Sequence, residues 1–367
     1  MKILHLPSAV GGNAWGLAES ERSIGLNSTV LVAAEDWLKY PADIKLGLEE
    51  IQTIVGKAAI IGLTFFDIRN KYDIFHFNFG NSLMHIPNKW KPYFPSIFKY
   101  IDMIDLPFYK KKSKLFVTYN GCDARQKFPT IERTSISACQ NTNCYGGMCN
   151  SGIFDKYRRH SIDKMARYVE HMWALNPDLL YFLPKEKSSF LPYTISKWLD
   201  LDPYPSKFDK KMKIVHAPTN REAKGSDPIL SAIEKIKKDS PNQIEVQLVE
   251  NVNHEKALKI YREADLVIDQ ILIGWYGGIA VEAMKMGKPV IARIAKEDLH
   301  FIPRQMAADL LETIISADPH TIEEVLRLCI EDRGYLKKRA EASLDYVNRW
   351  HNPQYVASLT KAKYESS

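Results

Sequence analysis

The stretch Asp269–Arg293 reads DQILIGWYGGIAVEAMKMGKPVIAR, and it decides the fold. It predicts a strand, a glycine pair, a helix, a tight turn and a second strand. Gly277 and Gly278 stand at the start of the helix, where the lack of a side chain lets the backbone approach an anion closely. The unpaired N–H groups of a first helical turn also favour negative charge. The pattern is therefore typical of a phosphate-binding loop in an α/β protein.

Glu282 lies one turn into this predicted helix, between the apolar pairs Ala280–Val281 and Ala283–Met284. A helix so apolar must be largely buried, and a buried carboxylate needs partners. Acidic side chains near such loops accept hydrogen bonds from ribose hydroxyls. The alternative interpretation is a tight turn followed by a solvated glutamate.

Strands and helices alternate on both sides of this segment. In the second half, strands are predicted over residues 213–216, 243–249, 264–269 and 289–293, with helices over 227–237, 255–263 and 278–286. In the first half, strands are predicted over residues 2–6, 28–33, 73–79 and 114–119, with helical patterns over 14–24 and 153–172. Such alternation predicts parallel, doubly wound sheets.

The expected fold class is α/β, with two Rossmann-like doubly wound domains facing across a cleft. We expect an N-terminal acceptor domain over residues 1–195, a donor domain over 205–345, and a C-terminal helix over 346–367 that returns toward the first domain. The proline- and lysine-rich stretch 184–210 is the expected linker. Ligands of such folds bind at the carboxyl ends of the strands.

Composition narrows the class of protein. The 367 residues are 45% hydrophobic and 26% charged, which is ordinary for a globular chain. No apolar run approaches the roughly 20 residues that span a bilayer, so we expect a cytoplasmic protein. A net charge of +6 suits an acidic small molecule or an anionic membrane surface. No nucleic-acid-binding motif is present, so no nucleic acid partner is expected.

The run Gly277–Ala292 resembles the C-terminal signature of GT-B glycosyltransferases, particularly family 4. In that family the glutamate of EAM-x-x-GKPVI holds the donor ribose, and Glu282 matches it. The resemblance implies a hexosyltransferase-type enzyme that uses a nucleoside diphosphate sugar, retains anomeric configuration and assembles bacterial surface polysaccharide on a glycan or lipid-linked acceptor. A second family glutamate, which contacts the sugar, is replaced here by Gly274.

A second candidate segment is His216–Ser226, HAPTNREAKGS, which follows a predicted strand. Lys224 and Arg221 could together neutralise a diphosphate, or they could be solvated loop charges. In retaining relatives an arginine and a lysine of this loop stabilise the leaving diphosphate. Lys224 matches the lysine, whereas the arginine position falls near Thr219, so Arg221 is a shifted substitute, and Thr219 and Asn220 are donor-binding candidates. No Asp-x-Asp motif is present, and we expect no cofactor to be required for catalysis.

Two segments of the first half carry the remaining candidates. Gly11, Gly12 and Asn13 resemble the family's glycine-rich first loop beside the donor, although a plain strand–helix turn would look the same. Residues 117–123, VTYNGCD, resemble a strand ending in His-Gly-x-Asp, with Asn120 at the histidine position. Asparagine forms hydrogen bonds but does not shuttle protons near neutral pH. Asn120 and Asp123 are grouped with Lys224 and Arg221 as catalytic candidates, Asp123 for binding sugar or acceptor hydroxyls.

His76, in DIFHFNF, either faces the cleft or has a structural role. Four cysteines are candidate ligands of a structural zinc ion: Cys122, Cys139, Cys144 and Cys149. The C-x4-C spacing of Cys139, Cys144 and Cys149 fits tetrahedral zinc, with Cys122 upstream as the fourth ligand, and disulfides or buried thiols are the alternatives.

Residues 89–114 interleave aromatic residues with lysines, a composition that suits an anionic membrane surface. We expect Lys110, Lys111 and Lys112 to face the inner side of a membrane, which would make the protein peripheral. An amphipathic segment packed on the sheet is the alternative.

Two other functions fit the same pattern. One is a nucleotide-sugar 2-epimerase on the same fold, and the other is a non-catalytic scaffold subunit that binds nucleotide sugars. Gly274 and Asn120, which depart from the family's pattern, favour the scaffold.

Overall fold

The computed structural model describes residues 1–35, 38–87, 100–204, 206 and 211–367. These residues group into two compact units, each with its own sheet. Unit 1 comprises Met1–Gln126, Gly152–Ser196 and Pro353–Ser367, and unit 2 comprises Lys127–Ser151 and Lys197–Asn352. Residues 127–151 thus cluster with the second sheet although they precede the expected linker. Pro353–Ser367 clusters with the first sheet.

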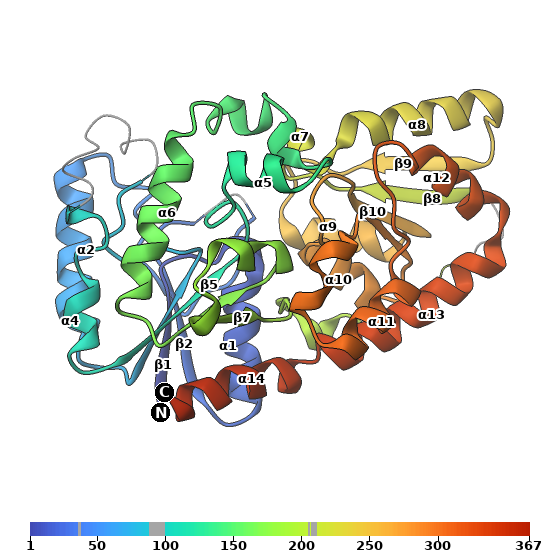
Figure 1. Ribbon diagram of the computed structural model, residues 1–367. Helices are drawn as coiled ribbons and strands as arrows, with labels where there is room; N and C mark the ends of the chain where they lie inside the picture. The colour runs from blue at the N-terminus through green and yellow to red at the C-terminus, as the bar shows by residue number, and fades with distance from the viewer. Residues whose placement is uncertain (36–37, 88–99, 205, 207–210) are drawn as a thin grey trace. The chain divides into compact units, whose positions relative to one another are not determined.

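The sheet of unit 1 has seven parallel strands in the order β3-β2-β1-β4-β5-β6-β7 (Figure 1). The strands are β1 (Lys2–Leu6), β2 (Asn27–Val32), β3 (Ile44–Lys45), β4 (Ile74–Asn78), β5 (Lys114–Tyr119), β6 (His171–Ala174) and β7 (Ser188–Phe190). The order reverses between β1 and β4, the switch point at which such sheets bind ligands. The loop after β1 carries Gly11 and Gly12 and leads into α1 (Asn13–Ser23).

The side chains of unit 1's central strands alternate between two helical layers. Phe75 and Phe77 point to one face, where their rings lie 4.3 and 6.0 Å from that of Tyr109 on α4 (Leu106–Lys110). His76 points to the other face, toward Tyr364 of α14 (Pro353–Ser366). There α14 packs beside α1 (Figure 1). The remaining helices of this unit are α2 (Ile54–Ile68) and α6 (Ile153–Ala166).

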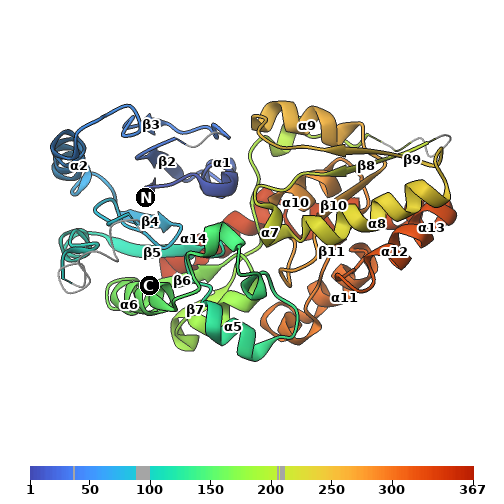
Figure 2. The same ribbon diagram turned by 90° about the horizontal axis from the view of Figure 1, so that it is seen from above.

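The sheet of unit 2 has four parallel strands in the order β11-β10-β8-β9 (Figure 2). They are β8 (Met212–His216), β9 (Ile244–Leu248), β10 (Leu266–Gln270) and β11 (Val290–Ala292). The helices are α5 (Lys127–Arg133), α7 (Arg221–Lys224), α8 (Ser226–Asp239), α9 (His254–Arg262), α10 (Gly278–Lys285), α11 (Arg304–Thr313), α12 (Ile322–Glu331) and α13 (Arg333–Trp350).

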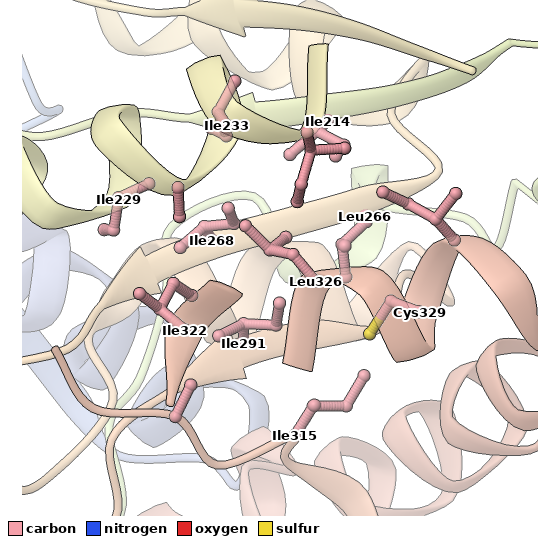
Figure 3. Close-up of a cluster of buried hydrophobic side chains, with 14 of the residues drawn as sticks. Ile214, Ile229, Ile233, Leu266, Ile268, Ile291, Ile315, Ile322, Leu326 and Cys329 are labelled. Atoms are coloured by element: carbon pink, nitrogen blue, oxygen red, sulfur yellow. The ribbon is translucent and has the colours of Figure 1, made fainter. Parts of the chain in front are cut away.

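The core of unit 2 lies between its sheet and the pair α8 and α12 (Figure 3). Ile268 and Ile291 rise from the strands toward Ile229 of α8 and Leu326 of α12, and all four are fully buried. Burying an aliphatic side chain of this size contributes about 1.5–3 kcal/mol. Cys329 lies in this core, and burial raises the pKa of its thiol to about 12.

Two sequence expectations differ from the structure. The helical pattern predicted over 153–172 stops at Ala166, and His171–Ala174 forms β6 instead, because all four residues are buried in pairing between β5 and β7. The linker was expected over 184–210, but Ser188–Phe190 still belongs to the first sheet, where it forms the edge strand β7. No helix in the described ranges is long and apolar enough to cross a bilayer.

Candidate functional site

At the carboxyl edge of the unit 2 sheet, polar groups of two loops meet at Asp269. This residue is the penultimate residue of β10, and its side chain is fully buried. The Lys224 ammonium lies 2.5 Å from Asp269 Oδ1, and the Gly277 N–H donates to Asp269 Oδ2 at 2.6 Å. The structure therefore brings the lysine loop and the glycine pair, both identified from sequence, onto one carboxylate. Asp269 itself was not identified.

Local backbone geometry fixes the position of Lys224. Asn220 caps α7, where its Oδ1 accepts a hydrogen bond from the Ala223 N–H at 2.8 Å. Gly225 ends the helix at φ 75°, and a Cβ there would lie 2.8 Å from Ile271 Cγ1. Glycine is needed on both counts. Asn220 therefore shapes the loop, whereas Thr219 is exposed.

Arg221 has a different partner. Its Nε and Nη2 lie 2.7 and 2.5 Å from the two Glu250 oxygens, a bidentate pair at the protein surface. Hydrogen bonding to Glu250 raises the pKa of Arg221, and the same pairing lowers the pKa of Glu250. Arg221 is thus engaged by Glu250, while Lys224 faces the glycine pair.

Glu282 is buried one turn into α10, as the apolar neighbours predict, and it has a partner that sequence reasoning missed. His254 Nε2 lies 2.6 Å from Glu282 Oε1, and His254 is itself buried at the start of α9. Asn253 caps that helix by accepting from the Lys256 N–H at 2.9 Å. The pair holds one carboxylate oxygen in place.

A buried tyrosine accompanies these two carboxylates. Burial, together with the charges of Glu282 and Asp269, raises the pKa of Tyr261 above its usual range. Tyr261 therefore stays neutral and can donate a hydrogen bond at every physiological pH.

The loop between β10 and α10 is fixed from within. The buried Gln270 amide donates to the Trp275 carbonyl at 2.6 Å, and its Oε1 accepts from the Ile273 N–H at 2.6 Å. At Gly274 a Cβ would lie 2.5 Å from Ala295 Cβ, while the Gly274 carbonyl accepts from the Ala295 N–H at 2.9 Å. No glutamate fits at this position without a backbone shift, which explains the departure from the family's pattern.

Lys288, in the turn after α10, is a buried lysine. Burial lowers its pKa to about 8, and the nearby Asp265 opposes that shift. Its Nζ lies 5.1 Å from the Tyr204 ring, and the Tyr204 N–H donates to the Met286 carbonyl at 3.0 Å. Lys288 thus helps to hold Tyr204 against the end of α10.

In unit 1, the glycines of the first loop make room for tyrosines. Gly11 and Gly12 have φ 67° and 72°, and a Cβ would lie 2.0 Å from Tyr193 Oη or 2.7 Å from Tyr40 Cε1. Asn13 is fully buried, and its Oδ1 accepts from the Thr194 N–H at 3.1 Å. This packing accounts for the two glycines without a ligand.

Asn120 and Asp123 lie in the loop after β5. The Asp123 carboxylate accepts the N–H groups of Asn120, at 3.0 Å, and Gly121, at 2.6 Å. Burial raises the pKa of Asp123, although these N–H groups oppose the shift. Asn120 Nδ2 donates to the Val10 carbonyl at 3.3 Å, while its buried Oδ1 has no hydrogen-bond partner in the described part of the chain. Asp123 therefore shapes the turn, and Asn120 offers an unused acceptor.

His76 belongs to a polar cluster beneath α14. Its ring nitrogens lie 2.6 Å from the Tyr364 hydroxyl and 2.7 Å from the Thr118 hydroxyl. Burial, with the charges of His5 and His171, holds its pKa well below the usual value. His76 is thus a neutral core residue.

Glu21 is the acceptor at the centre of this cluster. It accepts from His5 Nε2 at 2.8 Å and from the hydroxyls of Ser28, Tyr364 and Thr360, at 2.7, 2.8 and 3.1 Å. Burial would raise the pKa of Glu21, but His5 and these hydroxyls outweigh burial and lower it.

The predicted zinc ligands divide between the units. Cys122 is exposed in unit 1, whereas Cys139, Cys144 and Cys149 are half-buried in unit 2, in a segment that packs against α7. Among the described residues, the group whose ligand atoms could share an ion is His5, Glu21 and His76. The structural zinc stays a prediction, to be checked by metal analysis of the purified protein.

Comparison with known proteins identifies solved structures of similar fold. No protein-family model matches this chain, and no curated protein does. Among solved structures, sucrose-phosphate synthase from Thermosynechococcus elongatus superposes with a TM-score of 0.61 at 14% identity, over 100% of this chain and 98% of that one. UDP-GlcNAc 2-epimerase from Neisseria meningitidis, bound to UDP-GlcNAc, gives 0.54 at 15% over 99% and 100%. Anabaena Alr3699/HepE in complex with UDP-glucose gives 0.59 at 12% over 100% of both chains.

These likenesses confirm the expected fold class. The chain is an α/β protein with two Rossmann-like domains, the GT-B fold.

Proposed function

We propose that the chain is a glycosyltransferase that takes a sugar from a nucleoside diphosphate sugar bound at the carboxyl edge of the unit 2 sheet. The observation that carries the proposal is the convergence on Asp269. An ammonium group and a backbone N–H at a helix start meet on one buried carboxylate, one turn from the buried Glu282. A cation with a helix N-terminus suits a diphosphate, and a fixed carboxylate suits ribose hydroxyls.

In this mechanism Lys224 and the first turn of α10 stabilise the negative charge that develops on the leaving diphosphate. Their positive charge does the work that a divalent metal does elsewhere, so no cofactor is required for catalysis. His254 keeps Glu282 oriented, because the short contact between them leaves the second carboxylate oxygen for the ribose. Arg221, released from Glu250, would add a second cation.

The acceptor binds to unit 1, where the unused Oδ1 of Asn120 can accept a hydrogen bond from an acceptor hydroxyl. We further propose a glycan or lipid-linked acceptor, hexosyl transfer with retention, and a role in bacterial surface polysaccharide assembly. The likeness of residues 277–292 to family 4 supports these assignments. The protein would work in the cytoplasm, peripheral on the inner membrane face, with Lys110, Lys111 and Lys112 toward the lipid. Of the aromatic residues in this segment, Trp90, Tyr93, Phe94 and Phe98 lie outside the described ranges.

The test is thermal stabilisation by a panel of UDP-, GDP-, ADP- and CMP-sugars. A donor present at about 100 times its Kd should raise the free energy of unfolding by about 2.7 kcal/mol. Glu282→Ala should abolish this stabilisation, because the ribose loses its acceptor. Glu255→Ala, an exposed carboxylate on α9, is the matched control and should respond like the wild type. A full response from Glu282→Ala would contradict the ribose assignment.

A 2-epimerase is the second candidate, because the solved epimerase shares the fold over nearly the full length of both chains. The two enzymes differ in their products. A transferase releases nucleoside diphosphate only when an acceptor is present, whereas a 2-epimerase inverts a carbon of the nucleotide sugar without one. Proton NMR of the donor incubated alone distinguishes them. A scaffold subunit would bind the donor and change it under neither condition.

A further inference from the structure

The outward face of α2 is apolar along its whole length. Val55, Ala59, Leu63 and Phe66 recur at helical spacing on one side, and all four are exposed. Val55 is 80%, Leu63 72% and Phe66 63% exposed. Only Phe65 and Ile68 of this 15-residue helix are buried. A surface helix of a globular protein normally carries polar residues on its outward face. An apolar outward face of this size therefore indicates a binding surface.

The apolar surface continues from α2 onto α4, which lies beside it (Figure 1). The buried Phe65 ring joins them, at 5.4 Å from the exposed Phe66 ring and 5.9 Å from the exposed Phe108 ring. Ile101 and Ile104, just before α4, are also exposed. We name Val55, Ala59, Leu63, Phe66 and Phe108 the apolar face.

Cations border the apolar face. The Arg69 guanidinium lies 4.7 Å from the centre of the Phe66 ring, and the Lys111 ammonium lies 5.6 Å from that of Phe108. Within the described ranges, neither they nor Lys57 and Lys112 form an ion pair. Two acidic residues close by are paired with other lysines, Asp67 with Lys71 and Glu170 with Lys110, and the Asp105 carboxylate before α4 is buried and hydrogen-bonded to Ser82. The border therefore carries excess positive charge.

We propose that the apolar face is inserted into the headgroup region of an anionic lipid bilayer, with α2 lying in the plane of the interface. Apolar residues enter the acyl boundary while lysine and arginine reach the phosphates. A second copy of the chain is a poorer occupant, because a symmetric contact would oppose two cationic borders. The proposal deepens, and rests on, the membrane location in the proposed function. Its readout is vesicle binding, so it can fail separately from sugar transfer.

The experiment is co-sedimentation of the full-length chain with vesicles of phosphatidylcholine, with or without about one third phosphatidylglycerol. The wild type should bind the anionic vesicles. Leu63→Ser combined with Phe66→Ser should weaken binding at least about tenfold, through lost apolar burial. Leu199→Ser with Leu311→Ser, exposed leucines of unit 2, is the matched control and should bind like the wild type. Lys111→Gln with Lys112→Gln should weaken binding about fivefold per cation, and only with the anionic lipid.

Circular dichroism of each variant separates lost binding from lost folding. The proposal is overturned if the wild type ignores anionic vesicles, or if the folded Leu63/Phe66 variant binds as well as its control. It is also overturned if light scattering shows a dimer that Phe66→Ser dissociates and that does not sediment with vesicles.

Discussion

At the scale of single residues, the Asp269 carboxylate accepts hydrogen bonds from both the Lys224 ammonium and the Gly277 N–H. The positions of these three groups therefore depend on one another. A buried carboxylate that loses its cation keeps the cost of burial without the attraction that offset it. If a donor diphosphate binds here as proposed, it must supply a new arrangement for all three groups at once.

Lys224→Ala tests this arrangement. It should lower the free energy of unfolding by about 2–3 kcal/mol, less than for a fully buried pair because Lys224 is partly exposed. The control Lys235→Ala removes an exposed pair with Glu323 and should cost below about 1 kcal/mol. Urea denaturation without donor measures both. Equal losses in the two variants would show that the pair with Asp269 adds nothing to stability.

From the sequence, Gly277, Glu282 and Lys224 were predicted to belong to one candidate site. The sequence did not predict Asp269 or His254, their partners. Lys224 and Asp269 are 45 positions apart, and His254 and Glu282 are 28 apart. Such pairs depend on which strands are neighbours and in what register, and local pattern does not encode this.

At the scale of elements, α14 contributes hydroxyl groups that form hydrogen bonds with buried polar side chains in the core of unit 1. Tyr364 donates to Glu21 and contacts His76, and Thr360 also donates to Glu21. Because the Tyr364 hydroxyl donates its hydrogen bond to Glu21, it can only accept from His76, so His76 Nδ1 carries the hydrogen in the contact between His76 and Tyr364. The helix is thus held by hydrogen bonds that match one tautomer of a neutral histidine.

Tyr364→Phe should lower the free energy of unfolding by about 1–3 kcal/mol, because the buried Glu21 and His76 each lose a partner. Ser358→Ala, on the exposed side of the same helix, should change it by less than about 0.5 kcal/mol. Chemical denaturation of both variants is the measurement. If Tyr364→Phe left the free energy of unfolding unchanged, the hydroxyl would contribute nothing to stability, as when a water molecule takes its place.

Most strands and helices followed from periodicity, and the exceptions have physical causes. β6 continues an apolar helical pattern and becomes a strand only through its pairing with β5 and β7. α2 is apolar on nearly every side, so no amphipathic stripe marked its extent.

At the scale of the whole molecule, buried neutral histidines make stability depend on pH. Burial lowers the pKa of His76 and His216, and it lowers the pKa of His171 to about 4. In the unfolded chain these groups titrate near about 6.5. At these histidines the unfolded state binds more protons between about pH 6.5 and 4. Their contribution to the free energy of unfolding is therefore complete above about pH 6.5 and is lost as the pH falls through this window.

Urea denaturation at several pH values across this window should show that slope. His171→Asn should make it shallower, whereas His320→Asn, at an exposed position, should leave it unchanged. A slope that is as steep in His171→Asn as in the wild type would contradict the neutral state of His171 in the folded protein.

Neither unit is continuous in the chain: the boundaries fall at Gln126/Lys127, Ser151/Gly152, Ser196/Lys197 and Asn352/Pro353. During synthesis on the ribosome, unit 1 therefore emerges early but waits for α14 until the strands and helices of unit 2 have been translated. In the interval Glu21 lacks two of its hydroxyl donors. A nascent chain stalled before residue 353 would carry an unfinished first unit, a natural client for chaperones.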